Sequence, residues 1–328
     1  MPPRTLNQLV STVMPLMRHA RISLAVLSLL ALSACGGSST QSDKAVVLTV
    51  PTWSGGQANG AVARYLLEKK LGYKVQLRKM DEADAWTAIG TGKADAILED
   101  WGRKNEQRKW VQQKKTVVPA GSLGVKGQTG WYIPTYLADR HKNITEWQHL
   151  NDYASLFAGR NGGSTGELLE GSKQFLTHDE ELLKNLNLNY RTRYAGSEQA
   201  QLKEIRERAA KKEPFLTYWW RPHWVGEEVE LTKVNLPGYY DGCDSGQQKV
   251  VCGYPDAELQ KYLNTGFSKK GGDAATFLKK FQWSEDDQNK VAKRIAEDGL
   301  SADAAAEEWV EQNPGTWKIW LWGLGEDE

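Results

Sequence analysis

The sequence predicts an α/β fold, because segments with strand character alternate with segments of helical character. The first run of alternating elements is expected as strands over 46–50, 75–79 and 94–98, with helices over 59–71 and 84–90. A second run begins beyond residue 145, with strands expected over 190–194 and 214–219 and a helix over 197–210. Open α/β sheets bind ligands at the carboxyl ends of their strands, so candidate functional residues are sought there.

The elements have local signals of their own. Gly72 ends the helix over 59–71, and Asp81 or Asp84 is a suitable N-cap for the helix over 84–90. A turn of small residues over 162–166 predicts a helix over 167–176. Beyond Pro237 the pattern is helical to the end of the chain, with helices expected over 255–267, 273–281, 284–298 and 301–313.

The N-terminal residues have the pattern of an exported lipoprotein. A basic cluster at 18–21 precedes the short apolar run 22–31, and Leu32-Ser33-Ala34-Cys35 resembles a lipobox. We therefore expect residues 1–34 to be a signal peptide, Cys35 to carry lipid, and residues 35–44 to be a flexible tether. The apolar run is too short to span a bilayer, so the lipid is the only membrane attachment expected.

Composition and cysteine usage exclude several classes of function. The 328 residues are 40% hydrophobic and 25% charged with a net charge of +1, as in a globular protein, and no basic tract indicates a nucleic acid partner. Cys243 and Cys252 flank a polar loop, and an exported chain meets an oxidising compartment. We expect a disulfide between them rather than a metal site, because no histidine lies near either cysteine.

Three of the fourteen tryptophans follow predicted strands. Trp53 comes after the strand over 46–50, Trp101 after the strand over 94–98, and Trp220 after the strand over 214–219. Indole is the best aromatic face for a quaternary ammonium group, which has no hydrogen to donate. We interpret these three as a cation cage, Trp131 as a weaker candidate for the same cleft, and most of the others as core residues.

Several motifs, in order over most of residues 45–322, point to a known family. They are Leu71–Val75, Trp86–Ala96, Lys212-Glu213-Pro214, Trp220-Arg221-Pro222-His223-Trp224, Phe277–Trp283 and Asp287–Asn289. Together they resemble the glycine-betaine and quaternary-amine substrate-binding proteins of ABC importers. The resemblance implies a type II periplasmic-binding-protein fold with two lobes, each a mixed sheet flanked by helices, and a ligand cleft between them. It assigns residues 45–137 and 240–328 to one lobe and 138–239 to the other.

The same resemblance implies the function and the site. The chain is expected to be a monomeric, extracytoplasmic, lipid-anchored receptor without cofactor or enzymatic activity, which passes a quaternary amine to a permease and its ATPase. Trp53, Trp101 and Trp220 would enclose the trimethylammonium group. Backbone N–H groups of a turn at a helix start, matched here by Gly166 and Glu167, would hold the carboxylate of glycine betaine.

One position departs from the family pattern and keeps the ligand open. Some members have a histidine five residues after the second cage tryptophan, where this chain has Glu106. An ionised Glu106 repels a carboxylate unless it turns outward or pairs with Arg103 or Lys104. Choline and carnitine therefore remain alternatives to glycine betaine.

Two further classes of function are weighed against this one. A sugar-binding lipoprotein also stacks its ligand on tryptophan, but it needs Asp, Asn and Arg at strand ends that here are apolar or glycine. A secreted glycoside hydrolase using Glu99 or Asp100 needs a second carboxylate, and no partner motif is evident. The sequence also has no nucleophile elbow and no phosphate loop, so ligand binding is the preferred function.

Overall fold

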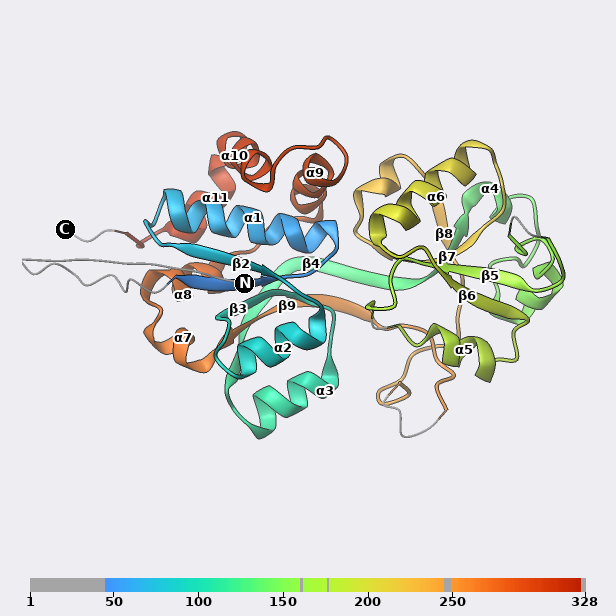
Figure 1. Cartoon of the computed structure of the whole chain (residues 1–328), viewed down its shortest axis with the longest axis horizontal. Helices are drawn as coiled ribbons and strands as arrows, with labels where there is room; N and C mark the ends of the chain where they lie inside the picture. The colour runs from blue at the N-terminus through green and yellow to red at the C-terminus, as the bar shows by residue number, and fades with distance from the viewer. Residues whose placement is uncertain (1–44, 160–161, 176, 245–248, 326–328) are drawn as a thin grey trace, which may run out of the picture. The chain divides into compact units, whose positions relative to one another are not determined.

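The computed structural model describes residues 45–159, 162–175, 177–244 and 249–325. Over these residues the chain forms two lobes joined through one nine-stranded sheet, with strand order β2-β1-β3-β9-β4-β7-β5-β6 and β8 paired to β4 (Figure 1). The α/β class predicted from sequence is confirmed. The predicted signal peptide, the tether and the lipid site Cys35 lie outside the described residues.

The first lobe begins with the predicted alternation. Strand β1 (Val46–Val50) pairs in parallel with both β2 (Val75–Lys79) and β3 (Ala96–Asp100). Helix α1 (Ser54–Lys69) joins β1 to β2, and α2 (Glu82–Gly90) joins β2 to β3. Asp81 caps α2 by accepting a hydrogen bond from the Asp84 N–H at 3.0 Å. All residues of β1 and β3 are buried, because helices cover both faces of the sheet.

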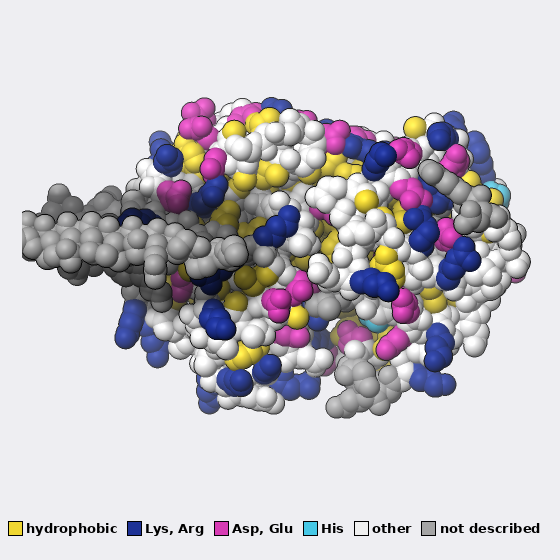
Figure 2. Space-filling model, in the orientation of Figure 1, with side chains coloured by type: hydrophobic (Ala, Val, Ile, Leu, Met, Phe, Trp, Pro, Cys, Tyr) yellow, Lys and Arg dark blue, Asp and Glu magenta, His cyan; other side chains and the backbone are white. Residues whose placement is uncertain are grey.

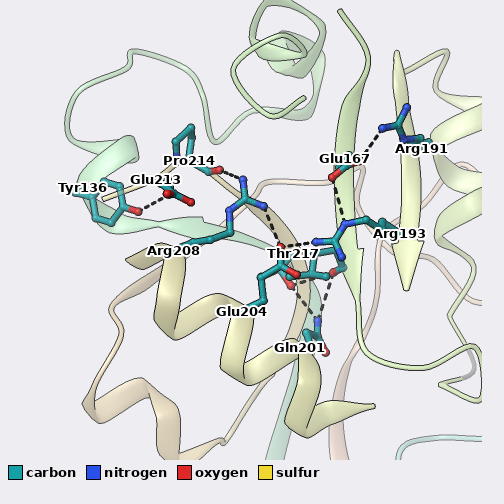
Figure 3. Close-up of polar contacts among 11 residues, drawn as sticks. Tyr136, Glu167, Arg191, Arg193, Gln201, Glu204, Arg208, Glu213, Pro214 and Thr217 are labelled. Carbon is teal, nitrogen blue, oxygen red and sulfur yellow. Dashed lines mark hydrogen bonds and ion pairs between the residues drawn. The ribbon is translucent and has the colours of Figure 1, made fainter. Parts of the chain in front are cut away.

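The second lobe repeats this arrangement. Strand β5 (Gly166–Glu170) lies in parallel between β6 (Tyr190–Tyr194) and β7 (Leu216–Arg221). The connecting helices are α5 (Asp179–Asn185) and α6 (Glu198–Ala210), and Ser197 caps α6. Gln201 fixes α6 to the sheet, since its amide donates to the Tyr218 carbonyl at 2.7 Å and to Thr217 Oγ1 at 2.9 Å (Figure 3).

Two long strands connect the lobes. Strand β4 (Val117–Pro134) pairs with β9 (Asp256–Asn264) along its first part and with β7 along its last part. Strand β8 (Leu231–Lys233) pairs with the end of β4, and β9 fits between β4 and β3. The chain therefore enters the second lobe along β4 and returns along β9, as Figure 1 shows.

Helices complete both lobes. Following β3, α3 (Lys104–Gln107) continues into a π-helix over Arg108–Gln113, and α4 (Thr135–Ala138) follows β4. Short 3-10 helices form over Trp147–Tyr153 and Trp224–Glu227. The final helices are α7 (Thr265–Lys270), α8 (Gly272–Lys280), α9 (Glu285–Ala296), α10 (Ala302–Gln312) and α11 (Pro314–Leu321). Helices α1, α9 and α10 cover one face of the first lobe's sheet, and α2 and α3 the other (Figure 1).

Tryptophans and phenylalanines fill the core under the final helices. The Trp309 and Trp320 rings stack at 5.8 Å, and Trp283 meets Trp309 edge to face at 5.2 Å. This agrees with the interpretation of most tryptophans as core residues. On the surface, Lys and Arg side chains are mixed with Asp and Glu on the face shown in Figure 2. None of the helices in the described part of the chain is long and apolar enough to cross a membrane.

Two of the helices expected from the sequence are wrong. The helix expected over 255–267 is strand β9 followed by α7. A charged residue at position 261 interrupts the apolar pattern expected of a buried strand. In the structure Lys261 is fully buried in the sheet, and its Nζ donates to the Lys279 and Phe281 carbonyls. Strand β4 was not predicted because glycines interrupt its sequence, and in the structure its pairing with β9 shifts register twice.

The helix expected over 167–176 is also wrong, because residues 166–170 form the central strand β5 of the second lobe. Beyond residue 240, where the family resemblance places the return to the first lobe, the first strand is β9, which begins at Asp256. The segment before it packs on the second lobe, where Asn185 donates to the Val250 carbonyl at 2.9 Å.

The disulfide Cys243–Cys252 generates a first prediction. Replacing both cysteines by serine should lower the free energy of unfolding by about 2–3 kcal/mol, because the open loop gains conformational entropy in the unfolded chain. Urea unfolding followed by tryptophan fluorescence measures the change. Equal midpoints for the serine variant and the oxidised protein would contradict a stabilising role of the disulfide.

Candidate functional site

An aromatic pocket lies where β1, β3 and β7 end. It encloses about 850 Å³ of empty space, part of it open to solvent. Its aromatic lining consists of Trp53, Trp101, Phe175, Tyr218, Trp220 and Tyr254. Trp53 and Trp101 belong to the first lobe. The other four lie between β4 and β9 in the sequence, so residues from both lobes line the pocket.

Glu99, in β3, fixes both tryptophans of the first lobe. Its Oε1 accepts hydrogen bonds from Trp53 Nε1 at 2.6 Å and from Trp101 Nε1 at 2.8 Å. Its Oε2 accepts from Asn59 Nδ2 in α1 at 2.5 Å and from Gln288 Nε2 in α9 at 2.8 Å. One carboxylate therefore sets the orientation of two rings that reach the pocket from different strands.

Trp101 rests directly on the backbone of β4. A Cβ atom on Gly127 would lie 2.3 Å from Cζ3 of the Trp101 ring and within 2.9 Å of two further ring atoms. Only glycine leaves room for the indole at this point, because such contacts are far inside van der Waals distance. Gly127 is thus part of the support of the ring, although it carries no functional group.

Trp220 is held by its own neighbours in the second lobe. Its ring stacks on Trp219 with centroids 4.5 Å apart, and His223 contacts it edge to face at 5.4 Å. Phe175 meets Trp220 edge to face at 5.6 Å and Trp53 at 6.4 Å, so it bridges the two sides of the pocket. Trp219 and Trp224 are buried outside the pocket lining, and His223 contacts Trp220 from outside that lining.

A buried hydrogen-bond cluster joins the lobes beside these rings. Glu198, at the start of α6, accepts from the Ser54 N–H at 2.8 Å and from the Ser54 hydroxyl at 2.7 Å. Its Oε1 also lies 2.8 Å from His223 Nε2. Since His223 Nδ1 accepts from the Val225 N–H, Nε2 is the ring nitrogen that donates to Glu198. Ser54 follows Trp53 in the sequence, and His223 contacts the Trp220 ring. The residues that connect the lobes are therefore neighbours of two pocket tryptophans.

Polar and ionisable side chains complete the pocket. Glu82, Arg103, His178 and Asp244 line it together with Thr129. Burial raises the pKa of Glu82 to about 8, against the opposing effect of Arg103, and its Oε1 has no hydrogen-bond partner among the described residues. Arg103 Nε likewise makes no hydrogen bond in the described structure. The described residues hold no group of three or more His, Cys, Asp and Glu side chains arranged to bind a metal.

Glu106 does not line the pocket. Its Oε2 lies 3.8 Å from Arg103 Nε, which is one of the two arrangements under which a ligand carboxylate is compatible with this residue. The objection to glycine betaine that the sequence raised is therefore weakened.

Gly166 and Glu167 are not where the sequence placed them. They lie in strand β5, away from the pocket lining, and their N–H groups already donate to the Asn189 and Phe157 carbonyls. The Glu167 carboxylate pairs with Arg191 at 2.7 Å and Arg193 at 3.2 Å (Figure 3). Gly166 is required for another reason, since a Cβ there would lie 2.3 Å from the Tyr190 ring.

Trp131 is also not a pocket residue, because it is fully buried and lies outside the lining. Its Nε1 donates to Asp179 Oδ1 at 2.7 Å, and the same oxygen accepts from the Tyr254 hydroxyl at 2.6 Å. Trp131 therefore helps to fix the carboxylate that orients the pocket residue Tyr254.

Sequence reasoning missed several pocket residues. Phe175 was assigned to a helix, and Tyr254 to the helical C-terminal part, so neither was considered near a strand end. Tyr218 was available from the pattern that identified Trp220, since residues two apart on a strand share a face. Glu82 carries no sequence signal, because it reaches the pocket from the first turn of α2.

A family model described as the substrate binding domain of the ABC-type glycine betaine transport system (OpuAC) matches residues 44–312. The trimethylamine N-oxide-binding protein of Pelagibacter ubique is 23% identical over 289 residues, which cover 84% of this chain and 90% of that protein.

Solved structures share the fold. Lactococcal OpuAC in its closed form with glycine betaine has a TM-score of 0.66 at 19% identity, covering 84% of this chain and 99% of that one. A choline binding protein of an ABC transporter in complex with choline has a TM-score of 0.68 at 16% identity, covering 85% and 92%. These similarities confirm the two-lobe type II binding-protein fold. Because the family model spans most of the chain, the protein belongs to the substrate-binding domains of ABC-type glycine betaine transport systems.

Proposed function

We propose that the aromatic pocket binds the trimethylammonium group of a quaternary amine, with Trp53, Trp101 and Trp220 as its cage. The observation that carries this proposal is that the three indoles, from two lobes, line one pocket with Phe175 between two of them. A quaternary ammonium is attracted by ring faces and by methyl packing, and it needs no hydrogen-bond acceptor.

The expected energies agree with a binding protein. A desolvated cation–π contact contributes about 2 kcal/mol, so three contribute roughly 6 kcal/mol. Micromolar affinity corresponds to about 8 kcal/mol. Burial of the methyl groups and contacts to the ligand's other end must supply the difference and offset the cost of lobe closure.

Glycine betaine is the ligand that we propose first. Arg103 lines the pocket, and its guanidinium suits a carboxylate at the ligand's far end. Choline is the alternative, because the acidic groups Glu82 and Asp244 can accept from a hydroxyl. Trimethylamine N-oxide has the same cationic group and is the ligand named for the Pelagibacter relative.

The finer assignment of location rests on the N-terminal sequence. We propose that Cys35 is lipidated after removal of residues 1–34, so that a monomeric receptor is anchored outside the cytoplasm. There it would present its ligand to the ABC permease and ATPase with which this family works.

Calorimetric titration of the purified protein with glycine betaine, choline and trimethylamine N-oxide tests the function. We expect at least one of them to bind with micromolar affinity or better, of the order of 8 kcal/mol. Maltose and glucose serve as controls for the sugar-binding alternative. Heat from a sugar and from none of the three amines would contradict the proposal.

The cage predicts the effect of two substitutions near Trp101. Trp101→Ala should weaken binding by about 30-fold, the equivalent of one desolvated cation–π contact. Gly127→Ala should also weaken binding by roughly tenfold or more, because the new methyl group occupies the space of the Trp101 ring. Calorimetry gives the affinities, and circular dichroism shows whether the variants are folded.

The matched control is Gly238→Ala, because a Cβ at Gly238 meets nothing within 4 Å. This variant should bind as the unsubstituted protein does. If Gly127→Ala and Gly238→Ala bind equally well, the position of the Trp101 ring does not matter for the ligand.

The raised pKa of Glu82 predicts a pH dependence. Glu82 has a pKa of about 8 and is largely protonated at pH 7, whereas a bound cation favours the ionised form. Choline binding should therefore release a proton, and its affinity should rise by up to about tenfold from pH 7 to pH 9. Titrations in buffers of different ionisation enthalpy measure the released proton. An identical pH profile in Glu82→Gln would exclude this residue as the source.

A further inference from the structure

The protonation state of Glu99 follows from its hydrogen bonds. The Trp283 indole can only donate, and it donates to Asn59 Oδ1 at 3.0 Å, so Asn59 Nδ2 is the atom that faces Glu99. Gln288 Nε2 lies between the acceptors Asn59 Oδ1 and Glu99 Oε2, which fixes that amide as well. All four partners of Glu99 are therefore N–H donors, and a protonated Glu99 would direct its own hydrogen at one of them.

These four N–H donors favour the ionised form of Glu99 in the protein interior. Glu99 is only 5% exposed. Burial raises the pKa of its carboxyl group, and the four hydrogen bonds act in the opposite direction. Those four partners, two indoles and two primary amides, are all neutral. They satisfy the oxygens without supplying a positive charge.

We propose that Glu99 is the specificity-determining residue by which the pocket selects a cation over a neutral group of the same shape. This inference rests on the proposed function. The negative charge lies behind the two rings that form the first-lobe side of the cage, and a trimethylammonium group on those rings would supply the missing counter-charge in a medium of low dielectric constant.

The hydrogen bonds add to this attraction. An indole N–H that donates to a carboxylate is polarised by it, and the electron density of the ring that faces the ligand increases. Trp53 and Trp101 donate to the same oxygen, so one negative charge polarises both rings. A tert-butyl group fits the same space and buries similar methyl groups, but it gains nothing from the charge.

A pair of ligands separates charge from shape. Choline carries a trimethylammonium group, and 3,3-dimethylbutan-1-ol is its neutral carbon isostere. Calorimetry, or competition where binding is weak, gives both affinities in the unsubstituted protein and in Glu99→Gln. We expect Glu99→Gln to weaken choline binding by about 30-fold and to change binding of the isostere by less than about threefold.

The matched control is Asp287→Asn. Asp287 also accepts from a buried indole, Trp309 Nε1 at 3.0 Å, and it lies in the same lobe outside the pocket lining. This substitution removes the same charge from an indole–carboxylate pair, and it should leave the ratio of the two affinities unchanged. An equal fall of the ratio in Asp287→Asn would overturn the inference, because the effect would then reflect net charge alone.

Glu99→Asp provides the second variant, in case Glu99→Gln does not fold. It keeps the charge but shortens the reach to the indoles, so both ligands should weaken while their ratio stays within about threefold. Equal losses of both ligands in Glu99→Gln, or a collapsed ratio in Glu99→Asp, would show that Glu99 only positions the rings. If the unsubstituted protein binds none of the trimethylammonium ligands, the proposed function fails, and this inference fails with it.

Discussion

Holding indole rings in fixed orientations is the constraint on which this structure depends. A quaternary ammonium is attracted by ring faces, so each ring must present its face to the pocket while its N–H finds an acceptor behind. Glu99 meets this need for Trp53 and Trp101 together. The same solution recurs away from the pocket, where Asp100 accepts from Trp86 and Asp179 from Trp131. Buried indole N–H groups are therefore paired with buried carboxyl groups, and burial of each carboxyl group costs desolvation free energy.

The architecture places the two halves of the pocket on different lobes. Trp53 and Trp101 follow β1 and β3, whereas Trp220 belongs to β7. Among the strands that the structure describes, β4 and β9 connect the two sets. The contact of Ser54 with Glu198 lies beside the same rings. The contact between the lobes and the aromatic pocket therefore share neighbouring residues.

The sequence predicts strands β1, β2, β3, β6 and β7, but it does not predict β4, β5 or β9. Trp53 and Trp101 could be singled out because each follows an apolar run that identifies a buried strand, and Trp220 because it lies near the end of such a run, within β7. The turn at Gly166 was misread, since its glycine accommodates the Tyr190 ring of a neighbouring strand, a contact with no local signal. Lys261 concealed β9, and Phe175 and Glu82 reach the pocket through tertiary folding alone. Burial of a charged residue and contacts between strands depend on the whole fold, so the hydrophobic periodicity of the sequence does not predict them.

The central claim is that the three tryptophans enclose the cationic end of the ligand. A crystal structure of the protein with glycine betaine bound tests this claim most directly. The account predicts a trimethylammonium nitrogen within about 6 Å of the ring centroids of Trp53, Trp101 and Trp220. A ligand bound elsewhere, or one whose methyl groups point away from these rings, would contradict it.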